Sequence, residues 1–303
     1  MKSLQSINSL PSKVTIVEVG PRDGLQNEKQ LLETDQKVNF IDRLSTCGLP
    51  VIECTSMVNP QWVPQLADAE VVIEKINRHP DVRYPVLVPN EQGMQRALAA
   101  GAKSIAVFVA ASESFNQKNL NCSIEKSFAR FAPVMALAQA AGIEVRGYLS
   151  CVMGCPYEGK IKPMKVATLA RHLIELGCYE VSLGDTIGVG TPLQAQRLIQ
   201  AVSKQVPIEQ LAIHFHDTRG QALANIFACL ELGINTIDAS VAGLGGCPYA
   251  NGSSGNVATE DVIYMLEGMG IETGVDLRAL SETGNMICQQ LNRSNNSKVG
   301  KFY

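Results

Sequence analysis

Eight short segments rich in β-branched and other apolar residues alternate along the chain with longer segments of helical period. Strands that are joined through helices pair in parallel, because such a connection returns the chain to the same end of the sheet. Eight β-α units in about 260 residues are typical of a closed (β/α)8 barrel. The predicted strands are residues 14–19, 51–56, 84–88, 104–110, 144–151, 180–185, 211–217 and 236–243.

An open, doubly wound sheet would give the same alternation of strands and helices. That fold more often carries a glycine-rich dinucleotide fingerprint directly after its first strand. Residues 20–28 read GPRDGLQNE, which does not match that fingerprint. The sequence therefore favours an α/β fold of the TIM barrel class.

The helical segments have recognisable ends. Several of them end at a glycine, the residue that most easily adopts the left-handed conformation of a helix C-terminus. Thr34 or Asp35 is expected to cap the first helix, and Pro192 lies where the first turn of a later helix is expected. The chain from about residue 275 is typical of an additional helix with a polar end, which should pack beside the barrel or remain partly loose. We predict a single domain, 1–303, with the barrel at about 14–281 and a C-terminal helical extension at about 282–303.

The composition excludes several classes of protein. A net charge of −3 and the absence of long runs of lysine and arginine leave no electrostatic basis for nucleic-acid binding. No apolar run approaches the roughly 18 residues that a membrane span requires, and the first residues lack the apolar core of a secretory signal. The nine scattered cysteines are expected to be mostly free thiols in a reducing compartment, which favours the cytoplasm.

Polar and charged residues gather at the C-terminal ends of the predicted strands, where the active sites of such barrels lie. Charged side chains at so many strand ends would be costly in a sealed core, so they indicate a polar site. These residues are Arg22 and Asp23 after the first strand, Glu53, Thr55 and Ser56 on the second, Ser150 and Cys151 on the fifth, Asp185 and Thr186 on the sixth, and His214, His216 and Asp217 on the seventh.

Two of the four histidines are separated by a single residue in the segment LAIHFHDTRG. His214 and His216 are expected to point to the same side, because alternate residues of a strand share a face. Asp23 can add a carboxylate to form a divalent-cation site, because only the eighth strand separates the first strand from the seventh. Other interpretations stay open: histidines in apolar runs are often hydrogen-bonded core residues, and Asp23 can form a plain ion pair with Arg22. Asp217 is expected to cap the helix that follows.

A glycine-rich loop, residues 243–256, contains Cys247 and five glycines. One interpretation is a flexible loop with an incidental thiol, and the other is a lid that brings the thiol onto a substrate. Cys151 and Cys155 lie four residues apart, but no second pair matches them, so we reject a zinc ribbon. Asp185 can support the residues of the site from outside, or it can cap the start of a helix.

Six segments, in order between about residues 14 and 290, together resemble the 3-hydroxy-3-methylglutaryl-CoA lyases. They read EVGPRDGLQNE, IECTSMVNPQWVPQLAD, SCVMGCPYEGK, SLGDTIGVGTP, HFHDTRGQALANI and GLGGCPYANGSSGNVATEDVIYML. The resemblance implies a TIM-barrel enzyme that cleaves 3-hydroxy-3-methylglutaryl-CoA to acetyl-CoA and acetoacetate, as in leucine degradation and ketone body formation. It also implies a homodimer.

The resemblance further implies metal ligands and catalytic residues. The implied metal ligands are Asp23, His214, His216 and Asn256. The implied catalytic residues are Arg22, which contacts the reacting carbonyl of the substrate, Cys247, Glu53, Asp185 and, as a partner in proton transfer, His214. This ligand set suits Mg²⁺ or Mn²⁺, although two imidazoles and a carboxylate also hold Fe(II), Co(II) or Zn²⁺.

Three other functions can be weighed against this one. A condensing synthase or an aldolase of the same barrel superfamily would use the same ligands, but such synthases commonly carry a long C-terminal region for which 303 residues leave no room. A metal-dependent hydrolase would require further histidine ligands, and His79 and His172 fall outside the predicted strands. A binding module would not need metal ligands, an arginine and a thiol at one barrel mouth. Contacts to the phosphates of an acyl-CoA are poorly marked, and the candidates are Lys160, Lys162 and Lys165.

Overall fold

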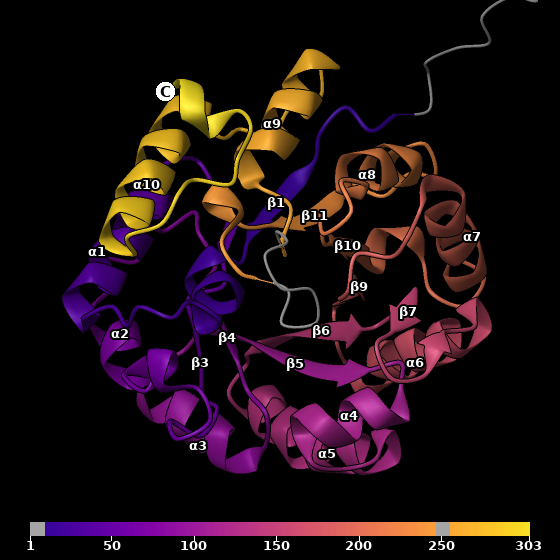
Figure 1. Ribbon diagram of the computed structural model, residues 1–303. Helices are drawn as coiled ribbons and strands as arrows, with labels where there is room; N and C mark the ends of the chain where they lie inside the picture. The colour runs from indigo at the N-terminus through magenta and orange to yellow at the C-terminus, as the bar shows by residue number, and fades with distance from the viewer. Residues whose placement is uncertain (1–9, 247–254) are drawn as a thin grey trace, which may run out of the picture.

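The computed structural model describes residues 10–246 and 255–303. Its main sheet is parallel throughout and has the strand order β2-β1-β11-β10-β9-β6-β5-β4-β3 (Figure 1). The strands are β1 (Thr15–Glu18), β2 (Val51–Ile52), β3 (Thr55–Ser56), β4 (Pro85–Leu87), β5 (Ser104–Ala110), β6 (Glu144–Ser150), β9 (Glu180–Asp185), β10 (Leu211–Phe215) and β11 (Thr236–Ala239).

The sheet closes on itself through the segment 51–56. Strand β2 pairs with β1, strand β3 pairs with β4, and only Glu53 and Cys54 separate β2 from β3. The backbone N–H of Glu53 donates to the carbonyl of Glu18 at 2.9 Å, and that of Cys54 donates to the carbonyl of Pro85 at 3.1 Å. The two short strands are therefore one interrupted barrel strand. All eight predicted strands are present, and the predicted closed (β/α)8 fold is confirmed.

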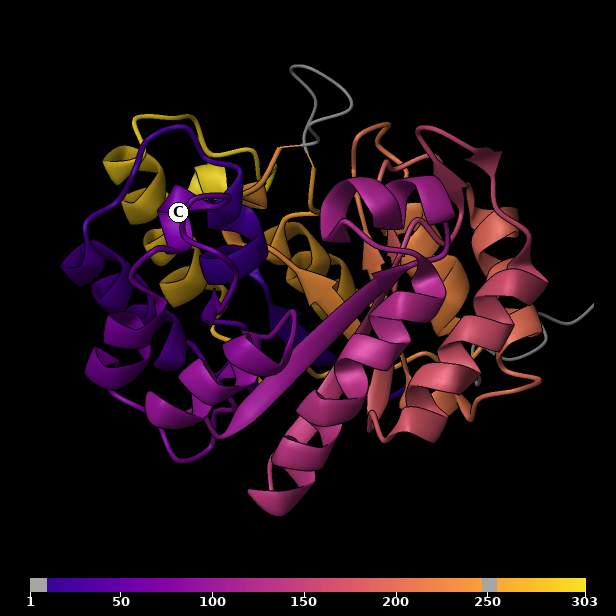
Figure 2. The ribbon, with the colours of Figure 1, turned by 90° about the horizontal axis from the view of Figure 1, so that it is seen from below.

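Helices form an outer layer around the strands (Figure 1), and Figure 2 shows the molecule from below. A two-stranded antiparallel hairpin, β7 (Gly154–Cys155) and β8 (Gly159–Lys160), lies outside the barrel sheet. The α-helices are α1 (Thr34–Ser45), α2 (Ala69–Lys75), α3 (Glu91–Ala99), α4 (Glu113–Leu120), α5 (Ile124–Ala140), α6 (Pro163–Leu176), α7 (Pro192–Val202), α8 (Ala222–Leu230), α9 (Thr259–Gly268) and α10 (Leu277–Gln290).

The helix ends agree with the sequence in one case and differ from it in another. Pro192 is the first residue of α7, as predicted. Its fixed φ suits a first turn, and a backbone N–H at this position would have no partner within the helix. The predicted cap of α1 is wrong, because the N-cap residue is Glu33 and not Thr34 or Asp35. The hydroxyl of Thr34 instead donates to Oδ2 of Asp68 at 2.7 Å, which ties α1 to the segment before α2.

The C-terminal segment packs on the outside of the barrel. Helix α10 contacts α1 and α9 (Figure 1). Asp261 of α9 accepts hydrogen bonds from the hydroxyl of Ser297 at 2.6 Å and from the backbone N–H of Val299 at 2.9 Å. The polar end of the chain is therefore bound to α9 rather than loose. The predicted division of the chain near residue 282 stays a prediction.

The apolar core and the barrel interior differ in character. The largest cluster of buried apolar side chains includes Phe40, Phe131 and Phe215, from both helices and strands. In contrast, β6 and β11 carry Arg146 and Asp238, which are only 0% and 1% exposed. Burial of these charges requires paired partners, and such partners are found around them. No helix within the described ranges is long and apolar enough to cross a membrane.

Candidate active site

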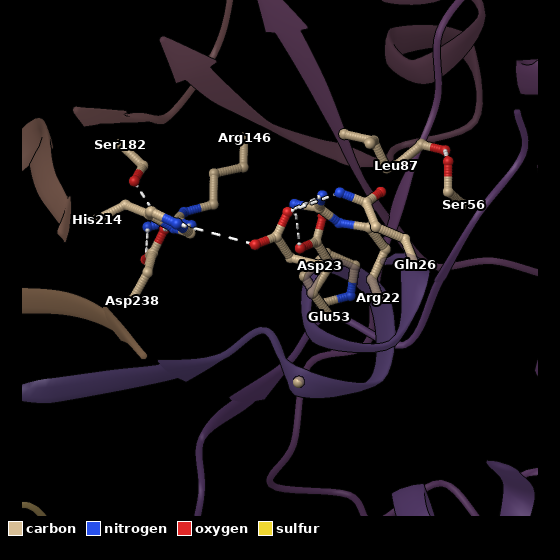
Figure 3. Close-up of polar contacts among 12 residues, drawn as sticks. Arg22, Asp23, Gln26, Glu53, Ser56, Leu87, Arg146, Ser182, His214 and Asp238 are labelled. Atoms are coloured by element: carbon tan, nitrogen blue, oxygen red, sulfur yellow. Dashed lines mark hydrogen bonds and ion pairs between the residues drawn. The ribbon is translucent and has the colours of Figure 1, made fainter. Parts of the chain in front are cut away.

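The predicted cation ligands converge at the C-terminal end of the barrel strands. His214 lies on β10, His216 directly follows it, and Asp23 lies in η1 (Gly20–Gly24), the helical turn after β1. One potential ligand atom of each residue lies within 4.8 Å of those of the other two. Nε2 of His214 lies 3.9 Å from Oδ2 of Asp23, and Figure 3 shows the two side chains facing each other. The structure therefore brings together the three residues that strand periodicity and position selected.

The protonation states of this cluster suit a cation. Burial opposes the charge of Asp23, but the nearby Arg22 and the two histidines outweigh it and lower its pKa to about 2. Burial, and then the charge of His214, lower the pKa of His216 to about 4. At neutral pH, Asp23 is therefore a carboxylate and His216 is a neutral imidazole. Nδ1 of His216 is buried and has no hydrogen-bond partner within the described part of the chain, which fits a group that awaits a ligand.

Asn256 lies against the same cluster. Its Nδ2 donates to Oδ2 of Asp23 at 2.8 Å and to the carbonyl of Leu244 at 3.1 Å. Its backbone pairs with that of His216 in an isolated bridge. The side-chain amide of Asn256 therefore lies beside the cluster, and its nitrogen is the atom that faces the carboxylate of Asp23.

Arg22 connects the cation ligands to a second carboxylate. Its Nη1 donates to Asp23 at 2.7 Å, and its Nη2 forms an ion pair with Glu53 at 2.7 Å (Figure 3). Burial opposes the charge of Arg22, but Glu53 and Asp23 outweigh it and hold the pKa of the guanidinium above its ordinary value. The Nε atom of Arg22 is buried without a partner among the described residues, and the guanidinium carbon lies 5.5 Å from the ring centre of Tyr148.

A cavity of about 500 Å³ opens at this end of the barrel. Arg22, Asp23, His214 and His216 line one part of it. Other parts are apolar or amphipathic and include the side chains of Val58, Trp62, Val63, Phe108, Phe115, Leu120 and Tyr148. The cavity therefore combines a charged end, where a small polar group can be held, with an apolar wall for a longer, less polar substrate.

Some predicted residues lie outside this cavity. Asp185 is fully buried at the end of β9, and its carboxylate accepts the backbone N–H groups of Val189 at 3.2 Å and Gly190 at 2.7 Å. It therefore holds the loop after β9, and neither it nor Glu53 lines the cavity. Cys247 lies outside the described residues.

Other predicted roles can also be placed. Asp217 is not the predicted N-cap residue of α8, because that residue is Gln221; Oδ1 of Asp217 instead accepts the backbone N–H of Ala222, the first residue of α8, at 3.0 Å from the preceding turn. The lysines considered for phosphate contact are exposed and do not line the cavity; they are Lys160, Lys162 and Lys165.

The sequence did not point to a buried network behind His214. Asp238 accepts from both terminal nitrogens of Arg146 and from the hydroxyl of Ser182, and its Oδ2 lies 3.4 Å from Nδ1 of His214. Burial opposes a charge on His214, but the bond to Asp238 and the charge of Asp23 outweigh it and raise the pKa of the imidazole. The available signal was a charged residue in the middle of a β-rich segment, in EVRGYLSC and in TIDASVAG.

The fold and the site define a class, the closed (β/α)8 barrels with a candidate divalent-cation site at the C-terminal ends of their strands. A family model described as HMGL-like matches residues 13–287. This chain belongs to that family, and the predicted family resemblance is confirmed.

Named relatives and solved structures resemble the chain over nearly its whole length. It is 59% identical over 299 residues to the mitochondrial hydroxymethylglutaryl-CoA lyase of Mus musculus, covering 99% of this chain and 92% of that protein. The crystal structure of hydroxymethylglutaryl-CoA lyase from Pseudomonas aeruginosa is 56% identical, with a TM-score of 0.95 and coverage of 97% and 98%. The lyase of Acinetobacter baumannii in complex with coenzyme A and 3-methylmalate is 39% identical, with a TM-score of 0.91 and coverage of 96% and 95%.

Proposed function

We propose that this protein cleaves 3-hydroxy-3-methylglutaryl-CoA to acetyl-CoA and acetoacetate with the help of a divalent cation. The relatives' names and the family support this carbon–carbon lyase activity, which the sequence predicted. The observation that carries the cation requirement is the convergence of Asp23, His214 and His216 beside Arg22 in one cavity.

The reaction requires the removal of a proton from a tertiary alcohol. The C3 hydroxyl loses its proton, the C2–C3 bond breaks, and its electron pair moves to C2 as a thioester enolate. C3 becomes the ketone of acetoacetate, and protonation at C2 gives acetyl-CoA. A divalent cation held by Asp23, His214, His216 and Asn256 would lower the pKa of the substrate hydroxyl and hold the substrate carboxylate. We propose Mg²⁺ or Mn²⁺, because the set includes carboxylate and amide oxygens.

Arg22 is proposed to stabilise the enolate oxygen. Its side chain lies between Asp23 and Glu53, so its position is fixed before the substrate arrives. The unpartnered Nε supports this role, because a buried donor without a partner can bind a developing negative charge.

Proton transfer is assigned to groups around the cation site. We propose Cys247 as the acid or base in the loop that follows β11, with His214 as a partner in proton transfer, and Glu53 as the acidic residue that holds Arg22 in place. Asp185 is proposed to support the reaction through the loop after β9, since its oxygens bond to Val189 and Gly190.

A condensing synthase of the same superfamily is the rival activity. The two are separated by incubating the purified protein with 3-hydroxy-3-methylglutaryl-CoA and measuring acetoacetate. In parallel, thiol release from acetyl-CoA is measured with a series of 2-oxo acids. We expect acetoacetate and no thiol release. Thiol release without acetoacetate would overturn the proposed reaction.

The cellular setting is proposed on more general grounds. The reaction suits leucine degradation and ketone body formation, and we propose a homodimer. We propose the cytoplasm as the location: eight buried free cysteines in the described part of the chain suit a reducing compartment, and the relatives include mitochondrial and cytoplasmic forms.

A further inference from the structure

We propose that Asp238 is a positioning residue that keeps His214 in the tautomer protonated at Nδ1. In that tautomer Nε2 carries the lone pair and faces Asp23. This inference rests on the proposed cation site, but it concerns a property that the cation-free protein must already have.

The two nitrogens of His214 face different carboxylates. Nδ1 lies 3.4 Å from Oδ2 of Asp238, whereas Nε2 lies 3.9 Å from Oδ2 of Asp23 (Figure 3). Strands β10 and β11 pair His214 with Asp238 in register, so this arrangement is set by the barrel itself. A neutral imidazole can donate only one hydrogen bond, so a choice of Nδ1 as the donor leaves Nε2 as the acceptor.

Asp238 is restricted to the role of an acceptor. Nη1 of Arg146 donates to its Oδ2 at 3.1 Å and Nη2 donates to its Oδ1 at 2.7 Å. The hydroxyl of Ser182 donates to Oδ2 at 2.7 Å. The proton between His214 and Asp238 must therefore belong to the imidazole.

The network extends one residue further, which supplies a matched control. Nε of Arg146 donates to Oε1 of Glu180 at 2.7 Å, and the two residues pair in register on β6 and β9. Glu180 balances Arg146, but no hydrogen bond or ion pair joins it to His214 among the described residues. A purely structural role for Asp238, as a counter-ion of Arg146, would make Asp238 and Glu180 equivalent in their effect on His214.

The two cation ligands on this strand are therefore not equivalent. His214 has an outer carboxylate partner, whereas Nδ1 of His216 has no hydrogen-bond partner within the described ranges. Outer partners of ligating histidines orient the ring and typically account for about 10–100-fold in metal affinity. Asp238 therefore acts on the affinity of the site through its contact with His214.

The direct test is ¹⁵N NMR of the cation-free full chain labelled at its histidine rings. Only four histidines are present, so His79→Gln and His172→Gln variants simplify the assignment. At alkaline pH, where the imidazoles are neutral, we expect His214 to be protonated at Nδ1 and unprotonated at Nε2. The opposite tautomer in the wild-type protein would overturn the inference, and this measurement needs no variant in the network.

Two variants separate positioning from structural support. Asp238→Ala should remove the tautomer preference of His214 and weaken Mn²⁺ binding about 10–100-fold. Glu180→Gln should leave the tautomer and the Mn²⁺ affinity close to those of the wild type. Equal effects of the two variants, or an unchanged tautomer in a folded Asp238→Ala protein, would contradict the inference. If Asp238→Ala does not fold, the ¹⁵N spectrum of the wild-type protein alone shows which nitrogen of His214 carries the proton.

Failure of the proposed function would look different. A wild-type protein that binds no Mn²⁺ and forms no acetoacetate would refute the lyase proposal, while the tautomer of His214 could still be read from the spectrum.

Discussion

At the scale of single residues, burial prepares the groups that the reaction uses. His216 is only 9% exposed, and burial together with the charge of His214 lowers its pKa to about 4. It is therefore neutral throughout the physiological range, and no proton competes with a cation for its ring. A residue in an apolar strand could equally have been a hydrogen-bonded core histidine, but its Nδ1 has no such partner among the described residues.

His216→Ala should weaken Mn²⁺ binding. Loss of an outer partner of a metal ligand costs about 10–100-fold in affinity, and loss of a ligand should cost at least as much. Titration with Mn²⁺, followed by the EPR signal of the free ion, measures the change. His79→Ala is the matched control, because His79 lies on the surface outside the site. Unaltered affinity in His216→Ala would remove this residue from the set of ligands.

Arg22→Gln should retain the fold and cation binding but lose about 100-fold or more of kcat. A well-aimed donor to a developing oxyanion contributes on the order of 3 kcal/mol to the transition state. Steady-state kinetics on 3-hydroxy-3-methylglutaryl-CoA give kcat, and Mn²⁺ titration checks the cation site. Turnover close to that of the wild type would contradict the role assigned to Arg22.

Cys247→Ala should leave Mn²⁺ affinity unchanged and should reduce kcat strongly. This expectation comes from the resemblance, since Cys247 lies outside the described residues. General acid–base catalysis typically contributes about 10²- to 10⁴-fold, which sets the expected loss. Cys178→Ala, which removes a buried thiol that does not line the cavity, is the control. An unchanged kcat in Cys247→Ala would make this thiol a bystander.

At the scale of elements, buried carboxyl groups fix the turn that follows β11. The backbone N–H of Ala242, in η4 (Val241–Gly243), donates to both oxygens of Glu260 at 3.0 and 2.9 Å. Oε1 of Glu18 accepts the N–H of Val241 at 2.9 Å. These contacts hold the start of the segment that leads into the glycine-rich loop with Cys247.

These two carboxyl groups should make the protein less stable as the pH rises. Burial raises the pKa of Glu18 to about 7 and that of Glu260 to about 8, in each case from 4.5. Because the pKa of each group is higher in the folded state than in the unfolded chain, each group contributes to the free energy of unfolding. This contribution is fully present below about pH 4.5 and is lost as the pH rises through about 7 to 8.

Glu260→Gln removes one of the two titrations, so its Tm should fall less than that of the wild type between about pH 5 and pH 9. The difference should reach several degrees, because one pKa unit is about 1.4 kcal/mol and 1 kcal/mol shifts the Tm by roughly 2–4 °C. Glu267→Gln, at an exposed position of the same helix, is the control. Parallel Tm profiles for wild type and Glu260→Gln would contradict this account.

Elements were predicted better than the contacts between them. The strands follow from apolar periodicity, and the shared side of His214 and His216 follows from it as well. Periodicity does not give the bonds of Asp185 to Val189 and Gly190, because these depend on the path of the loop after β9. Segment 51–56, in contrast, was predicted as one strand, and its backbone bonds alternately to its two neighbours: Ile52 donates to Arg83, Glu53 to Glu18 and Cys54 to Pro85.

The network around Asp238 was missed for a different reason. The sites of such barrels lie at strand ends, whereas Arg146 and Asp238 are in the middle of their strands. Strands β9 and β10 separate β6 from β11 in the sheet, so the contact between Arg146 and Asp238 depends on the curvature of the closed barrel. A charged residue inside a β-rich segment is therefore a usable signal once a closed barrel is predicted.

At the scale of the whole molecule, barrel closure places residues from opposite ends of the chain around one cavity. Asp23 follows the first strand, His214 lies on the strand before the last, and His216 directly follows that strand. Helix α10 packs on the outside of the barrel against α1 and α9 (Figure 1). The central claim is that this arrangement holds a divalent cation.

A crystal of the protein soaked in Mn²⁺ tests that claim most directly, with data collected at an energy where manganese scatters anomalously. We expect one anomalous peak within coordination distance of the Asp23 carboxylate and of a ring nitrogen of His214 and of His216. A fully soaked crystal with no peak between these three side chains would contradict the account.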